Sequence, residues 1–171
     1  MTDSEWMDSL TRPSKTVSAA LALLGSWIVF LAVVNVSIGA YSEGRKVLWI
    51  DFFTGVRDSS TTDMALVIDD GMFGFIGLAI IGLGAMGMNN THESGFSGWI
   101  RGLPSCIVGC LFSSGRSTNE LISSWLVALG VLFYLAWSVM EYTWVDPGVY
   151  SVAAVLVSFG VGIGLLEESS N

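Results

Sequence analysis

The hydrophobic pattern of this chain divides it into four long uncharged runs separated by shorter polar segments. The plainest run follows Asp69 and Asp70: residues 71–88 contain no charged, amide or hydroxyl side chain, and six of these eighteen residues are glycine. Eighteen residues form a helix of roughly 27 Å, which is close to the hydrocarbon thickness of a bilayer. The pattern therefore predicts a transmembrane helix here.

The four runs together predict an all-α integral membrane protein, a bundle of four antiparallel transmembrane helices. The first run is longer than the core of a secretory signal, so we interpret it as a retained span. The last connection has only six residues, which forces its two spans into an antiparallel hairpin. The predicted spans are 17–41, 64–88, 121–141 and 148–166, joined by loops at 42–63, 89–120 and 142–147 and flanked by a polar N-terminal tail, 1–16, and an acidic tail, 167–171.

Two of the connections carry apolar residues of their own. In the longest one, 89–120, an apolar run of about ten residues is interrupted by Pro104, which makes it too short to span and predicts a short interfacial or re-entrant segment. A fifth span would have to carry Arg101 through the membrane. The aromatic cluster at 47–53 is typical of residues at headgroup level, with docking of a partner protein as the alternative.

Small residues recur at helical spacing in three of the predicted spans. Apolar side chains gain little by leaving lipid for one another, so close backbone contact along small residues is a principal source of helix association in membranes. Asn35 is the one strongly polar side chain of the first span, and we expect it to form an interhelical hydrogen bond. The predicted helix-packing seam consists of Ser18, Ala22, Gly25, Ala32 and Gly39 in the first span, Gly74, Gly77 and Gly84 in the second, and Ser151, Ala154, Ser158 and Gly162 in the fourth.

Asp69 and Asp70 are the candidate ion-binding residues. Two adjacent carboxylates with no Lys or Arg near them in the sequence can hold a cation or retain a proton, and ionisable groups at membrane depth often mark an ion path. Alternatively, the acids mark the start of the helix, where its dipole favours negative charge. Helical spacing places Asp70 on the face of Gly74 and Gly77, and Asp69 about 100° away. If either carboxylate acts within the membrane, we expect it to be Asp70.

Composition and charge narrow the choice of partners. With 52% hydrophobic and 13% charged residues, the chain is too apolar for an ordinary soluble domain. Its formal net charge of −8 argues against nucleic acid and against polybasic binding to anionic lipid surfaces. The expected partners are the lipid bilayer and a protein partner or a second copy bound through the helix seams. Both termini lie on one side, and a majority of one Lys or Arg favours the cytoplasm.

No catalytic constellation is visible in the sequence, so we expect neither an enzyme, nor a metal site, nor a cofactor. One histidine and two cysteines do not match the ligand spacing of a metal cluster. Cys106 and Cys110 lie four residues apart. In size and number of spans the chain resembles the membrane thiol oxidoreductases of the disulfide-bond-forming and vitamin K epoxide reductase type. Those families use C-x-x-C, whereas this chain has C-x-x-x-C once.

These observations favour a structural or accessory membrane protein, such as a complex subunit or the small envelope protein of a virus, that associates by small-residue helix packing. The alternative is a small cation or proton channel or carrier subunit that uses Asp70. A membrane thiol oxidoreductase using the cysteine pair is the third hypothesis.

Overall fold

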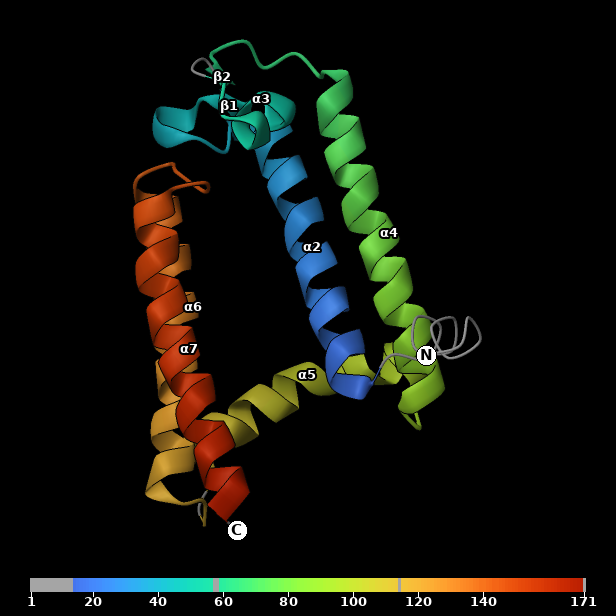
Figure 1. Cartoon of the computed structure of the whole chain (residues 1–171), viewed down its shortest axis with the longest axis vertical. Helices are drawn as coiled ribbons and strands as arrows, with labels where there is room; N and C mark the ends of the chain where they lie inside the picture. The colour runs from blue at the N-terminus through green and yellow to red at the C-terminus, as the bar shows by residue number, and fades with distance from the viewer. Residues whose placement is uncertain (1–13, 57–58, 114, 171) are drawn as a thin grey trace. The chain divides into compact units, whose positions relative to one another are not determined.

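The computed structural model describes residues 14–56, 59–113 and 115–170 (Figure 1). Helices make up 79% of the structure, which confirms the all-α fold class. Four of the described helices are long and apolar enough to cross a membrane: Lys15–Ile38, Ile68–Thr91, Thr118–Met140 and Pro147–Glu167. In chain order the elements are α2 (Lys15–Ile38), η1 (Ser42–Gly44), β1 (Lys46–Val47), α3 (Trp49–Thr54), β2 (Ser60–Thr61), α4 (Ile68–Thr91), α5 (Gly95–Phe112), α6 (Thr118–Met140) and α7 (Pro147–Ser170).

The helix bounds differ from the predicted ones mainly at the ends. The second span begins at Ile68, so the first four residues of the predicted span, 64–67, precede the helix, and it continues to Thr91. The interfacial or re-entrant segment is a continuous helix, α5, with Pro104 inside it. The last helix continues through the predicted acidic tail to Ser170. Most of the predicted N-terminal tail, 1–13, lies outside the described residues.

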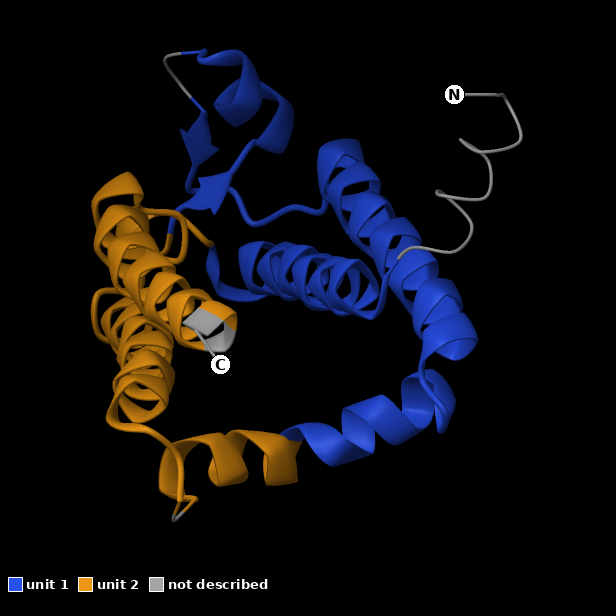
Figure 2. Cartoon of the chain, turned by 60° about the horizontal axis from the view of Figure 1, so that its bottom comes forward, with its two compact units in different colours: residues 1–39, 45–103 blue, residues 40–44, 104–171 orange. Residues whose placement is uncertain are grey.

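The chain forms two compact units (Figure 2). Unit 1 comprises residues 1–39 and 45–103, and in it α2 and α4 form a helical hairpin with β1, α3 and β2 in the connection between them. Unit 2 comprises residues 40–44 and 104–171, and in it α6 and α7 form a second hairpin, with the C-terminal half of α5 leading into α6.

In unit 1, α2 and α4 pack so closely that their backbones touch through glycine. A Cβ added to Gly77 would lie 2.8 Å from Val29 Cγ2, and one added to Gly84 would lie 2.5 Å from the backbone nitrogen of Ala22. Real Cβ atoms do not approach other atoms so closely, so a larger residue would push the helices apart. The positions contacted on α2 decrease as those on α4 increase, which makes the pair antiparallel (Figure 1).

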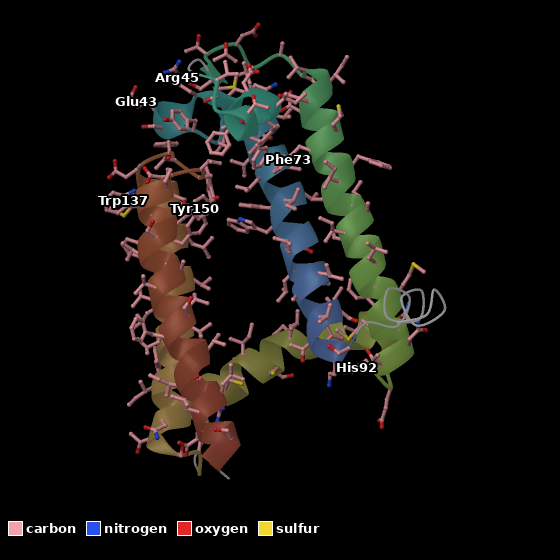
Figure 3. The ribbon with its side chains drawn as sticks, in the orientation of Figure 1. Glu43, Arg45, Phe73, His92, Trp137 and Tyr150 are labelled. Atoms are coloured by element: carbon pink, nitrogen blue, oxygen red, sulfur yellow. The ribbon has the colours of Figure 1, made fainter. Side chains whose placement is uncertain are left out.

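Unit 2 uses the same packing between α6 and α7. A Cβ added to Gly130 of α6 would lie 2.9 Å from Val157, and one added to Gly160 of α7 would lie 2.8 Å from the carbonyl oxygen of Ser123. The turn between the two helices is held by two tyrosines: the hydroxyls of Tyr134 and Tyr150 both donate to the carbonyl oxygen of Trp144, over 2.6 Å and 2.8 Å. Trp137, by contrast, points outward from α6 (Figure 3).

The segment 40–44 lies against this turn within unit 2. The backbone N–H groups of Trp144 and Val145 donate to the carbonyl oxygen of Ala40, over 2.8 Å and 2.9 Å, and that of Gly44 donates to Tyr142 O over 3.2 Å. The turn therefore satisfies its backbone groups by pairing with residues about a hundred positions earlier in the chain.

Candidate functional site

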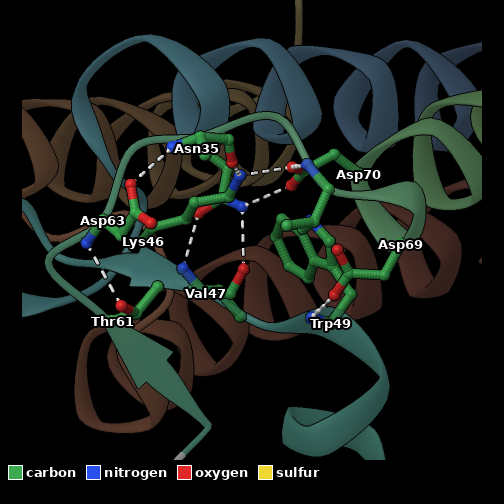
Figure 4. Close-up of polar contacts among 10 residues, drawn as sticks. Asn35, Lys46, Val47, Trp49, Thr61, Asp63, Asp69 and Asp70 are labelled. Carbon is green, nitrogen blue, oxygen red and sulfur yellow. Dashed lines mark hydrogen bonds and ion pairs between the residues drawn. The ribbon is translucent and has the colours of Figure 1, made fainter.

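The candidate site is a buried polar cluster in unit 1, where the start of α4 meets α2 and the strand β1 (Figure 4). Asp70 lies at its centre, in the first turn of α4, and is only 3% exposed. Its Oδ1 accepts a hydrogen bond from Asn35 Nδ2 over 2.9 Å, and its Oδ2 accepts one from the Val67 backbone N–H over 3.1 Å. The second bond caps the helix, and the carboxylate also meets the positive end of the helix dipole there.

Lys46 supplies the positive charge of the cluster. Its Nζ lies 2.5 Å from Asp70 Oδ2, and both side chains are almost completely shielded, with 0% and 1% of their surfaces exposed. The same ammonium donates to the backbone carbonyl oxygen of Ala65. Isolated buried charges are very unfavourable, so burial of this pair depends on each partner having the other and on further hydrogen bonds.

Asn35 connects α2 to both other parts of the cluster. Its side-chain amide donates to Asp70 on α4 and to the carbonyl oxygen of Val47 over 2.9 Å, and its Oδ1 accepts from the Val47 backbone N–H over 2.7 Å. The expected interhelical hydrogen bond of Asn35 is therefore confirmed. The amide also pairs with a residue of β1 as a neighbouring strand would, which fixes the connection to the hairpin.

Asp69 has a different environment from its neighbour. Its Oδ2 accepts from the Trp49 backbone N–H over 2.7 Å, but its Oδ1 is buried without a hydrogen-bond partner among the described residues. Trp49 is 3% exposed, and its ring stacks on that of Phe73, one turn beyond Asp69, with 3.8 Å between ring centroids. The indole Nε1 of Trp49 is likewise without a partner in the described part of the chain.

The charges of the cluster do not cancel. Asp70 and Lys46 form a neutral pair, and Asp69 adds a second carboxylate, which leaves one net negative charge. Every oxygen of Asp70 is occupied by protein donors, so its first role is structural: it holds the connection to the α2–α4 hairpin. The acceptor that remains for a proton or an ion is Asp69 Oδ1. Among the described residues no group of three or more His, Cys, Asp or Glu is placed to hold a metal ion.

Sequence reasoning identified Asn35 and Asp70 but missed Lys46. The absence of a nearby Lys or Arg holds along the sequence and is wrong in space, because the chain turns back after α2 and brings Lys46 onto α4. A signal was present: Lys46 is one of only two lysines in the chain. It also directly precedes Val47, whose backbone pairs with the side chain of Asn35.

The structure places the predicted seams of the first two spans against each other. Ser18, Ala22 and Gly25 are buried on α2. Gly84 of α4 approaches the backbone of Ala22 and Ser18, whereas Gly77 approaches Ile28 and Val29, which lie outside the predicted seam. Gly39 follows α2 as its C-cap, with φ 77° and ψ 136°, and is buried. The remaining members of the contact are Ala32 on α2 and Gly74, Gly77 and Gly84 on α4.

The predicted seam of the fourth span lies elsewhere. Ser151, Ala154 and Ser158 are exposed, and a Cβ added to Gly162 would meet no atom within 4 Å. The face of α7 that packs on α6 is the opposite one, which contains Gly160. Within unit 2, therefore, the small-residue stripe of α7 has no helix against it.

The cysteines and the histidine do not join the polar cluster. Cys106 is exposed and Cys110 is half-buried, both on α5, and neither is in a disulfide. His92 follows the end of α4 (Figure 3), and its Nδ1 accepts from the Ser94 backbone N–H over 3.3 Å.

Comparisons of the chain with protein-family models, with curated proteins and with solved structures gave no significant match.

Proposed function

We propose that this multi-pass membrane protein is a structural or accessory component, a subunit of a membrane complex or of a viral envelope, that associates with other helices by small-residue packing. One observation carries the proposal: the stripe formed by Ser151, Ala154, Ser158 and Gly162 on α7 is uncovered in unit 2. A lipid-facing surface has no need of small residues, whereas a helix partner does. The proposed role is non-enzymatic, and the cytoplasmic position of the termini stays a prediction.

The polar cluster of unit 1 supports the same proposal. Asp70, Lys46 and Asn35 use their hydrogen-bonding and charge capacity on one another and on the backbone of the connection. Such a network stabilises a particular arrangement of two helices and a loop. That is what a subunit needs in order to present a constant surface to its partners.

The test is the assembly state of the full chain, extracted from its native membrane in mild detergent and measured by native mass spectrometry. Ala154→Leu places a bulky side chain on the stripe. Val152→Leu, which is also exposed but lies about 100° from Ser151, is the matched control. We expect the wild type and Val152→Leu to retain a stoichiometric partner or a second copy, and Ala154→Leu to lose it. A wild-type chain that is a lone stable monomer would refute the proposal.

The second candidate is a small cation or proton channel or carrier subunit. The sequence predicts Asp70 as its ion-binding residue, but we propose Asp69 instead, because both oxygens of Asp70 already interact with Asn35, the Val67 N–H and Lys46. The buried, unpartnered Asp69 Oδ1 beside a cluster of net negative charge favours it. In vesicles reconstituted with the chain, Asp69→Asn should abolish cation or proton flux, while Asp63→Asn, an exposed acid of the same unit, should leave it unchanged. The absence of flux with the wild-type chain would remove this candidate.

A further inference from the structure

Unit 2 contains an apolar groove that is not part of the packing between α6 and α7. It is a cavity of about 470 Å³ between the C-terminal half of α5 and residues 123–132 of α6. Ile107 and Leu111 line it from α5, and Val127 and Leu132 line it from α6. Both cysteines of the chain, Cys106 and Cys110, also line this groove. Cavities of this size and character hold small apolar ligands.

Arg116 lies at one end of this groove, in the short connection between α5 and α6. Its Nη1 donates to the carbonyl oxygen of Cys110 over 2.8 Å and to Ser124 Oγ over 3.2 Å, and Cys110 and Ser124 are both lining residues. Its Nε donates to Glu120 over 3.2 Å, and this hydrogen bond raises the pKa of the guanidinium above its ordinary value. The side chain is 28% exposed.

One part of this guanidinium remains available. No hydrogen bond is formed by Nη2 to any described residue, so its two N–H groups can donate to a ligand from solvent or from the membrane surface. Glu120 takes only the Nε side of the fork. Each of these N–H groups can donate one hydrogen bond to a phosphate oxygen, and arginine presents them in a rigid plane.

When α6 spans a bilayer, the groove runs along the direction of a lipid chain, because its lining follows the axis of α6. Arg116 precedes α6 by two residues and therefore stands at the end of a candidate span, where headgroups lie. From Ser123 to Leu132 the lining of α6 extends nine residues further, which is roughly 13 Å along the helix. Half of a bilayer's hydrocarbon is roughly 15 Å thick. The groove thus has its charge at headgroup level and an apolar wall about one leaflet deep.

We propose that this groove binds one acyl chain of an anionic phospholipid, whose phosphate is held by Arg116. The site is independent of the helix stripe on α7 and does not depend on the proposed function. It also gives the two thiols a place in the molecule: they line the wall of a lipid site, and a bound chain covers them.

The native cysteines provide the assay, because the only two thiols of the chain line the groove. The full chain is reconstituted into nanodiscs of phosphatidylcholine alone or with added phosphatidylglycerol, and the rate of N-ethylmaleimide labelling of each thiol is measured by mass spectrometry. Both bilayers shield the protein surface alike, so the difference between them reports the site. We expect labelling to be about tenfold slower with phosphatidylglycerol, as for a site about nine-tenths occupied.

Variants separate the charge of Arg116 from its structural bonds. Arg116→Gln should abolish the phosphatidylglycerol-dependent protection, whereas Arg116→Lys, which keeps the charge but loses the planar fork, should retain part of it. Arg101→Gln, an exposed arginine on α5, is the matched control and should behave as the wild type. If Arg116→Gln does not fold, Ala128→Phe tests the same site by filling the groove, and it too should remove the effect of the lipid.

Several outcomes would overturn the proposal. One is equal labelling in the two bilayers, which would mean either an empty groove or one covered by protein. Another is protection that persists in Arg116→Gln. A third is protection by glycerol phosphate added to phosphatidylcholine nanodiscs, because a headgroup that binds without its chain makes the groove irrelevant.

Discussion

The ion pair between Lys46 and Asp70 leads to the sharpest prediction about stability. Lys46→Met removes the ammonium and keeps most of the volume of the side chain, so the main change is electrostatic. Asp70 then remains buried with its neutral donors, Asn35 Nδ2 and the Val67 N–H, but without a countercharge. The charge has no route to water, because the Asp70 side chain is 1% exposed.

The magnitude follows from this burial. At 2.5 Å and an effective dielectric constant of about 20, the Coulomb attraction within the pair is on the order of 7 kcal/mol. Desolvation of both ions offsets most of it when the pair forms. Removal of one partner leaves the desolvation of the other uncompensated, and such substitutions cost about 3–5 kcal/mol. We expect Lys46→Met to lower the free energy of unfolding by this amount, and Asp70→Asn to do the same.

The double variant distinguishes charge pairing from ordinary packing. Lys46→Met with Asp70→Asn leaves no buried charge at this point, so it should be no less stable than either single variant. The coupling free energy in the cycle should then exceed about 2 kcal/mol. Lys15→Met is the matched control, since Lys15 is the other lysine of the chain and is exposed; its effect should stay within about 0.5 kcal/mol.

The measurement is the free energy of unfolding of the full chain in mixed micelles of a mild detergent and dodecyl sulfate, followed by tryptophan fluorescence. Additive effects of the two substitutions, or a loss below about 1 kcal/mol for Lys46→Met, would show that the pair is not a buried ion pair of the kind described.

Three further predictions use the same unfolding assay. Gly84→Ala should destabilise the chain by about 1–3 kcal/mol, because the added Cβ would meet backbone 2.5 Å away. Gly82→Ala, whose Cβ would meet no atom within 4 Å, should stabilise the chain by up to about 1 kcal/mol. Equal effects of the two substitutions would contradict the close packing. Asn35→Ala should cost about 2–4 kcal/mol, since it leaves a strand N–H and a carboxylate oxygen unpartnered, and a neutral result would refute the network. Tyr134→Phe should lower the free energy of unfolding by about 1 kcal/mol, because the hydroxyl of Tyr150 still donates to the shared carbonyl oxygen of Trp144. The double variant with Tyr150→Phe should lose clearly more than the sum of the two single variants. Losses that simply add would show that the two hydroxyls do not share this carbonyl.

The sequence by itself determined the four spanning helices and the face of α4 that packs on α2. Each apolar run is long enough to need a helix in lipid, because unpaired backbone groups are too unfavourable there. Helical periodicity then put Asp70 on the face of Gly74, Gly77 and Gly84, and the structure has these residues on the side of α4 that meets α2. Such features follow from length and from a repeat of 3.6 residues, which are local properties of the chain.

Tertiary structure alone decided which groups meet. Lys46 and Asp70 are 24 positions apart, and only the return of the connection onto α4 turns a pair of acids into one neutralised carboxylate and one with a spare oxygen. The same holds for α7, where helical spacing predicted a seam of Ser151, Ala154, Ser158 and Gly162, whereas packing on α6 uses the opposite face, which contains Gly160. Periodicity defines the faces of a helix. Which face meets a neighbour depends on the total energy of contacts between segments far apart in the sequence, and a local pattern carries no information about those contacts.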